Sequence, residues 1–135
     1  MTALAAERST VKKEGEFRVF QLAADTKIYQ GALVAIDANG RAVPGSTATT
    51  LKGVGRAEET IDNIGGAAGD KSISVRRGIF QYVNSAGGDL IAAKDIGASC
   101  YMVDDQTVAL TSAAGTRSVA GIIHDVDANG VWVKF

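Results

Sequence analysis

The chain has very little of the residue types on which most enzymes and small secreted proteins depend. It contains one cysteine, Cys100, and one histidine, His124. One cysteine cannot close an internal disulfide, and one cysteine with one histidine cannot supply the three or four ligands of a zinc site. We therefore expect no metal centre, and we expect Cys100 to be an inert, half-buried strand residue.

The net charge is close to zero, and long apolar runs are lacking. Fourteen basic residues stand against fifteen acidic ones, so the chain lacks the positive field that draws a protein to nucleic acid or anionic lipid. No apolar run approaches the roughly eighteen residues of a membrane-spanning helix, and residues 1–13 lack the apolar core of a signal peptide. The sequence disfavours direct nucleic-acid binding, membrane insertion and secretion through a standard signal peptide.

Proline and aromatic residues are rare, whereas glycine is abundant. There is one proline, Pro44, against sixteen glycines. The tetrad Asp-Ala-Asn-Gly occurs twice, at 37–40 and 127–130, each time between short runs rich in Val and Ile. Asn-Gly is the preferred pair for a tight type I′ hairpin turn, because both central residues of that turn need positive φ. The pattern predicts an all-β fold, a small barrel or sandwich of hairpins.

Apolar alternation places the expected strands along the chain. They fall at 17–22, 32–36, 41–43, 51–57, 72–76, 79–83, 99–103, 107–111, 118–123 and 131–135. At most one short helix is expected, at 89–96, with Asp89 as its N-cap and Gly97 at its end. Residues 58–70 are expected to be irregular. We divide the chain into an extended N-terminal arm, 1–16, and a single β-rich domain, 17–135.

The two halves of the chain also resemble each other. Residues 31–43 resemble 97–110, and residues 51–57 resemble 119–123 when Gly53 is aligned with Gly121. Gene duplication explains this resemblance, and so does the independent use of the same hairpin pattern.

Three motifs suggest chemistry, and each is incomplete. Residues 125–130 match the first half of an EF-hand loop but lack its final glutamate and flanking helices. Residues 65–72 resemble a phosphate-binding loop, yet Asp70 precedes the lysine and a strand follows. A Ser-His-Asp set around His124 lacks a G-x-S-x-G motif, and His124 and Asp125 should point to opposite faces of a strand. The sequence therefore predicts no catalytic residue, no cofactor and no enzyme.

Several segments together resemble a known family. They are Gly-Val-Gly-Arg-Ala-Glu-Glu at 53–59, the glycine-rich loop at 62–70, Val-Arg-Arg-Gly-Ile-Phe at 75–80, Tyr-Met-Val-Asp-Asp-Gln-Thr-Val at 101–108, and the ending at 123–135. In these segments the chain resembles the small capsid decoration, or cement, proteins of tailed bacteriophages and prophages. The resemblance covers most of the chain after about residue 50 and consists of strand and turn motifs.

The resemblance implies a structural protein on the capsid exterior of the virion, made in the host bacterial cytoplasm. Its partner would be the major capsid protein, whose neighbouring subunits it would lock together, and it would be a homo-oligomer, with a trimer favoured. We expect the arm and two basic pairs to contact the shell, and apolar strand faces to join the subunits. The expected contact residues are Lys12, Lys13, Phe17, Arg18, Arg76 and Arg77.

A different class remains open as an alternative: a small soluble β-barrel that binds a carbohydrate or single-stranded nucleic acid. Such sites usually present clustered exposed aromatic residues. Here Tyr29, Tyr82, Tyr101 and Trp132 are scattered along the sequence. A third hypothesis, a hydrolase, depends on His124 alone.

Overall fold

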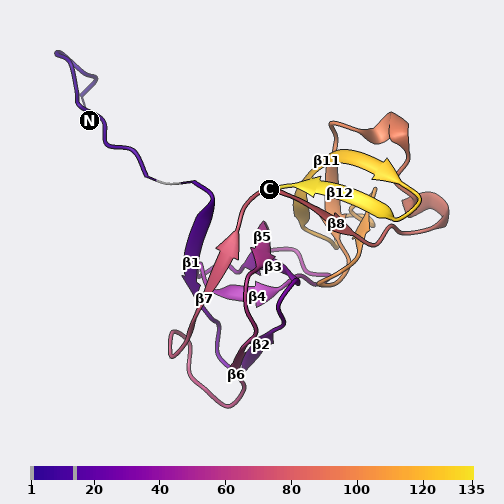
Figure 1. The fold of residues 1–135 in the computed structure, drawn as a ribbon, viewed down its shortest axis with the longest axis horizontal. Helices are drawn as coiled ribbons and strands as arrows, with labels where there is room; N and C mark the ends of the chain where they lie inside the picture. The colour runs from indigo at the N-terminus through magenta and orange to yellow at the C-terminus, as the bar shows by residue number, and fades with distance from the viewer. Residues whose placement is uncertain (1, 14) are drawn as a thin grey trace.

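The structure is a computed structural model that describes residues 2–13 and 15–135. It consists of two five-stranded antiparallel sheets, one two-stranded pair and two single-turn 3-10 helices (Figure 1). The all-β prediction is confirmed. Each sheet curls so that its two edges meet at one parallel bridge, Leu22 to Ala42 in the first and Val83 to Thr107 in the second. Because a single bridge joins the edges in each case, the described strands do not form a fully hydrogen-bonded closed barrel.

The first sheet has the order β1-β7-β5-β3-β4. Its strands are β1 (Phe17–Gln21), β3 (Leu33–Ile36), β4 (Ala42–Pro44), β5 (Lys52–Ala57) and β7 (Ser72–Arg76). The pair β2 (Thr26–Ile28) and β6 (Ile61–Asn63) lies beside it. This sheet encloses an aliphatic core of Leu22, Ile28, Ala32, Val34, Ala42, Val54, Ala57, Ile73 and Val75.

The second sheet has the order β10-β9-β11-β12-β8. Its strands are β8 (Ile79–Tyr82), β9 (Ser99–Met102), β10 (Val108–Ala109), β11 (Val119–Asp127) and β12 (Gly130–Lys134). Its core contains Tyr82, Ile91, Cys100, Met102, Val108, Ala120, Ile123, Val131 and Val133. Leu33 and Ala35 of β3 belong to this core as well, so β3 contributes alternate side chains to the two cores.

The two sheets approach each other closely at Gly53. A Cβ atom on Gly53 would lie 2.0 Å from the carbonyl oxygen of Ala120, so only glycine lets β5 approach β11 this closely.

A structural repeat underlies both sheets. Residues 31–57 form β3, β4 and β5, and residues 97–123, 66 positions later, form β9, β10 and the first half of β11. In each unit the third strand pairs with the first and carries one bulged residue, Val54 or Ala120. The bond from the Gly31 amide to the Ala57 carbonyl (2.9 Å) recurs from Gly97 to Ile123 (2.8 Å). The resemblance between the halves is therefore structural, although the bulges align Gly121 with Gly55 and not with Gly53.

The predicted helix at 89–96 is wrong. Asp89 ends the first 3-10 helix, η1 (Gly87–Asp89), and the second is η2 (Ala93–Asp95). The Asn84 side chain accepts a hydrogen bond from the Ile91 amide and donates one to its carbonyl, which removes the groups that an α-helix would need. Gly97 does follow the turn with a left-handed φ of +95°, as expected for a C-terminal stop.

Both Asp-Ala-Asn-Gly tetrads form hairpin turns, but not of the type I′ that Asn-Gly favours. Neither Asn39 nor Asn129 has positive φ, and the left-handed angle falls on Gly40 and Gly130. The Asp37 carboxylate accepts a hydrogen bond from the Asn39 amide at 2.9 Å, and Asp127 holds Asn129 in the same way at 2.8 Å. The aspartates thus set the turn geometry.

Two short strands were missed. β6 lies in the segment predicted to be irregular and pairs with β2, where no strand was expected. Each has only three residues, too few for a periodic signal. The segment before β1 carries no strand in its described part, residues 2–13 and 15–16, and extends away from both sheets (Figure 1).

Candidate interaction surfaces

The six expected contact residues belong to the arm, to the start of β1 and to the end of β7 that pairs with it. We call this set, Lys12, Lys13, Phe17, Arg18, Arg76 and Arg77, the arm junction. Phe17 of β1 lies opposite Arg76 of β7, whose guanidinium carbon sits 4.7 Å from the Phe17 ring centroid. Arg76 also donates to the Glu16 carboxylate at 3.0 Å, and the Arg77 amide donates to the Glu16 carbonyl at 2.8 Å. These bonds fix the point from which the arm departs.

The arm junction has an apolar component as well as its cations. Lys13, Phe17, Arg18, Val19 and Phe20 line an open depression of about 420 Å³. Val19 is 68% exposed and Phe17 is 47% exposed. Lys12 and Lys13 are exposed in the arm. Cations beside an exposed apolar strand favour a protein surface that offers both acidic and apolar groups.

The N-terminal part of β1 presents a free strand edge. The Leu22 amide donates to Lys71, and the Glu16 carbonyl accepts from Arg77, so the even-numbered residues of β1 bond to β7. By antiparallel alternation, the backbone groups of Phe17 and Val19 point away from β7. Among the described residues, none pairs with that edge at these two positions. An unpaired edge can accept a strand from another chain.

The outer face of the second sheet is a second exposed apolar surface. Register places Ile122 beside Ser99 and Lys134, Lys134 beside Ile79, and Val119 beside Tyr101. We define the outer face as Ile79, Tyr101, Val119, Ile122 and Trp132. Ile79, Val119 and Ile122 are each about two-fifths exposed. Single exposed apolar residues are common, but three of them with two half-buried aromatic residues on one sheet face form a patch that suits a protein partner.

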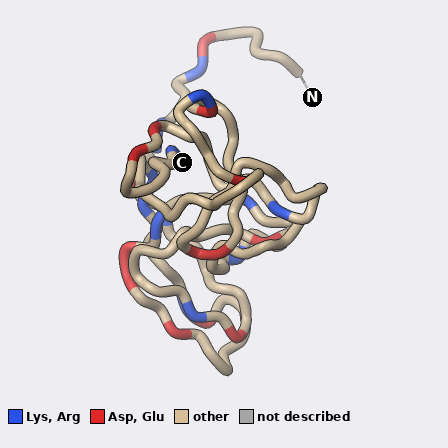
Figure 2. The backbone as a smooth tube through the Cα atoms, turned by 90° about the vertical axis from the view of Figure 1, so that its right-hand side faces the viewer, with Lys and Arg blue, Asp and Glu red and all other residues tan. Residues whose placement is uncertain are grey.

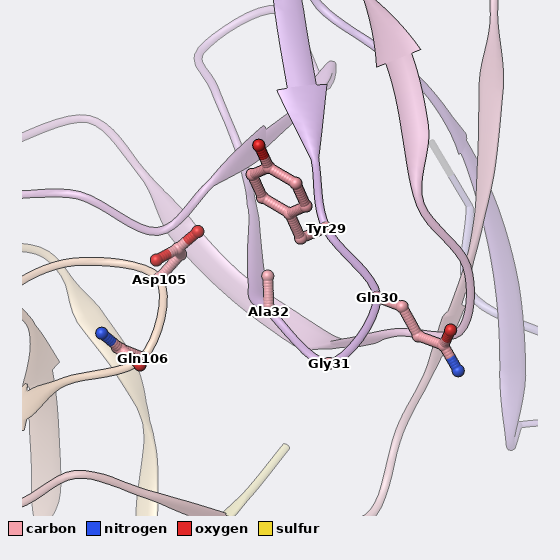
Figure 3. A pocket seen from close by; sticks show the side chains of 6 residues that line it. All are labelled: Tyr29, Gln30, Gly31, Ala32, Asp105 and Gln106. Atoms are coloured by element: carbon pink, nitrogen blue, oxygen red, sulfur yellow. The ribbon is translucent and has the colours of Figure 1, made fainter.

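A polar groove lies at the boundary of the two sheets, around Gly31. Its largest part, about 430 Å³, is lined by Tyr29, Gln30, Gly31, Ala32, Asp105 and Gln106. Figure 3 shows Asp105 and Gln106 on one side and Tyr29 and Ala32 on the other, with Gln30 extending away beyond Gly31. Two adjoining depressions of about 190 Å³ share Gly31. Sequence reasoning missed this groove, because its residues come from five separate segments.

The motifs that suggested chemistry serve structural roles. In the glycine-rich loop, the Gly65 amide donates to Asp25 and the Ala67 amide donates to Asp70, so carboxylates occupy the place of a phosphate. In the EF-hand-like segment, Asp127 accepts hydrogen bonds from the Asn129 amide and the Trp132 indole. Within residues 2–13 and 15–135 there is no group of three or more His, Cys, Asp or Glu side chains that could hold a metal ion.

The nucleophilic side chains do not form a reactive set either. His124 is exposed on a bulge of β11, where the register shifts between Ile123 and Asp125. Cys100 is fully buried, not half-buried as expected, and burial raises its pKa to about 11. Burial likewise raises the pKa of Tyr82 well above its usual range, with the charge of Arg56 acting in the opposite direction. A thiol and a phenol held neutral in this way are poor nucleophiles.

Charges of both signs are interspersed along the backbone (Figure 2). In the part of the chain that the structure describes, no helix is long and apolar enough to cross a membrane. Comparison of the chain with protein-family models, with curated proteins and with solved structures finds no match.

Proposed function

We propose that this chain is a structural decoration protein of a tailed-bacteriophage head, which binds the outer surface of the icosahedral capsid and stabilises contacts between major capsid subunits. The observation that carries the proposal is the arm junction: an extended arm leads directly into a strand whose edge is unpaired and whose outward side chains are apolar. Such a surface serves association by wide contact and needs no catalytic group.

The arm and the free edge of β1 make the shell contact. A strand of the capsid protein pairs with the backbone groups at Phe17 and Val19, while Lys12, Lys13 and Arg18 face acidic groups on the shell. Because many copies bind one shell, modest affinity at each contact is sufficient for stable decoration.

The outer face of the second sheet joins the subunits, and a trimer satisfies the threefold positions of a capsid lattice. Val119 and Ile122 lie at the centre of this contact. This assignment leaves the arm junction, on the other sheet, free for the shell.

The shell contact is tested by co-sedimentation with capsids that were assembled without the decoration protein. Deletion of residues 1–16 is expected to abolish binding. The far-ultraviolet circular dichroism spectrum should remain that of a folded β protein. Val19→Pro replaces the side chain and removes an outward amide without breaking a hydrogen bond to β7, so this variant should fold and yet lose most of its occupancy.

Val19→Ala is the matched control, because it removes the side chain and keeps the outward amide. It should bind more strongly than Val19→Pro. Full occupancy of capsids by both the arm deletion and Val19→Pro would refute the proposed shell contact.

A further inference from the structure

Beyond the proposed capsid role, we propose that the groove around Gly31 binds a neutral, hydroxyl-rich ligand, a short stretch of oligosaccharide. We call it the Gly31 groove and define it by its lining residues: Tyr29, Gln30, Gly31, Ala32, Arg56, Ala57, Glu58, Gln81, Tyr82, Val83, Asp105, Gln106 and Asn129.

The backbone that forms the groove is held in place before any ligand arrives. The carbonyl of Asp105 accepts from the Leu33 amide at 2.8 Å, and that of Gln106 accepts from the Val83 amide at 2.8 Å. The Val103 carbonyl accepts from the Thr47 hydroxyl at 2.9 Å. The hairpin tip of the second unit is thereby bonded to the first unit. A fixed backbone lowers the entropy cost of ordering a binding site.

The side chains on this fixed backbone are left for a ligand. Four amides line the groove: Gln30, Gln81, Gln106 and Asn129. Within the described part of the chain, none of these four side-chain amides makes a hydrogen bond to another residue; by contrast, the amide of Asn63 makes two. An amide both donates and accepts, as a sugar hydroxyl does, so several amides on one groove match a polyol better than they match an ion.

The charges of the groove favour a neutral ligand over an anionic one. Arg56 is paired with Glu58 at 2.7 Å, and Lys27, which lies beside Tyr29, is paired with Asp62 at 3.9 Å, so both cations near the groove are offset. Asp105 adds a carboxylate on the opposite wall. Phosphate groups would meet net negative charge here, which disfavours single-stranded nucleic acid.

Tyr29 supplies the apolar component that sugar recognition needs. It is 58% exposed at the edge of the largest depression, and the ammonium group of Lys27 lies 4.8 Å from its ring centroid. The ring face that Lys27 does not cover can stack on the C–H face of a pyranose while the amides bind its hydroxyls. The groove is open to solvent and its three depressions share Gly31, so a chain of several sugar units can lie across it.

Titration of the uniformly ¹⁵N-labelled full chain tests the site, with maltohexaose, cellohexaose and chitohexaose as neutral probes. At least one of them should produce saturable shifts in the side-chain NH₂ signals of Gln30, Gln81 and Gln106. Gln106→Ala and Asn129→Ala should each weaken that binding about five- to tenfold, the effect of losing one or two hydrogen bonds. The backbone carbonyl of Gln106 remains, so the spectrum outside the groove should not change.

The chain provides a matched control in its other tetrad. Asn39→Ala makes the same change at the same kind of turn, away from the groove, and should leave the affinity unchanged. The proposal is overturned if no neutral probe produces saturable shifts at about 10 mM, or if Asn39→Ala weakens binding as much as Asn129→Ala. It is also overturned if only a heparin tetrasaccharide or an oligothymidylate binds.

Discussion

The two copies of the repeated unit differ in how much of each is covered. In the first, residues 31–57, one face packs on its own core, and the other, with Leu33 and Ala35, packs into the core of the second sheet. In the second, residues 97–123, Cys100 and Met102 are buried, whereas the opposite face carries exposed Val119 and Ile122.

Equivalent positions show the cause of this difference. Gly53 of the first unit corresponds to Val119 of the second, and Arg56 corresponds to Ile122. Gly53 lies against the backbone of Ala120, where no side chain fits, while Val119 projects from the sheet. The same backbone pattern is therefore buried between the sheets in the first copy and exposed on the sheet surface in the second.

Adding one methyl group to the covered unit should have the largest effect. Gly53→Ala places a Cβ atom 2.0 Å from the Ala120 oxygen, so the sheets must separate, and we expect a loss of about 3 kcal/mol in unfolding free energy. Val119→Ala, at the equivalent position, should cost only about 0.5 kcal/mol. Urea denaturation followed by circular dichroism measures both.

Gly88→Ala is the control for the loss of a glycine as such, because a Cβ atom there meets nothing within 4 Å. It should be close to neutral. Equal destabilisation by Gly53→Ala and Gly88→Ala would show that close packing at Gly53 is not the reason for the effect.

The second prediction concerns the exposed copy. If the outer face joins subunits, Ile122→Glu places a carboxylate in that apolar contact, where its desolvation is costly even beside Lys134, and should reduce the mass in multi-angle light scattering to that of one chain. Stability of the isolated chain should change by less than about 0.5 kcal/mol, since Ile122 is exposed within it. An unchanged mass for Ile122→Glu, or a wild-type chain that is already monomeric, contradicts the assignment of this face.

A substitution at Tyr82 of β8 should change the unfolding free energy by a smaller amount. Tyr82 is 6% exposed, its ring packs edge-on to Phe135, and its buried hydroxyl makes no hydrogen bond within the described chain. Tyr82→Phe removes that unsatisfied group and keeps the packing, so we expect unfolding free energy to rise by about 1 kcal/mol. Thermal unfolding monitored by calorimetry measures it, with Tyr101→Phe on the outer face as the control. A lower stability for Tyr82→Phe would mean that the hydroxyl has a partner.

Much of the fold could be predicted from the sequence because strand signals are local. Alternation and Asp-Ala-Asn-Gly located ten of the twelve strands and both hairpin turns, whereas β2 and β6 were too short to predict. The repeat could be detected only weakly, since its bulges, not its glycines, define the alignment. The identical tetrads do not mark equivalent positions of the repeat. The first forms the turn between β3 and β4 within the first unit, whereas the second lies beyond the second unit, between β11 and β12.

A surface can be predicted from the sequence only where its residues are neighbours in the chain. Lys13, Phe17 and Arg18 lie close together at the start of β1 because they are close in sequence, and the pairing of β1 with β7 brings Arg76 to them. The Gly31 groove joins residues from positions 29 to 129, and its shape depends on hydrogen bonds such as that between Leu33 and Asp105. No local pattern signals such a contact.

The smallest expected effect distinguishes the two tetrads. At Asp127, a hydrogen bond from the Trp132 indole, 2.8 Å long, holds the carboxyl pKa below its ordinary value of 3.8, with the Asn129 amide contributing further. A carboxyl pKa that is depressed by folding contributes stability that is present above pH 3.8 and is lost as the pH falls through the folded-state value. Trp132→Phe should therefore raise the Asp127 pKa toward 3.8, which carboxyl ¹³C titration measures. The same substitution should reduce the pH dependence of the unfolding free energy in acid. Trp132→Phe with an unchanged Asp127 titration would show that the turn amides alone stabilise the carboxylate, which would make the second tetrad equivalent to the first.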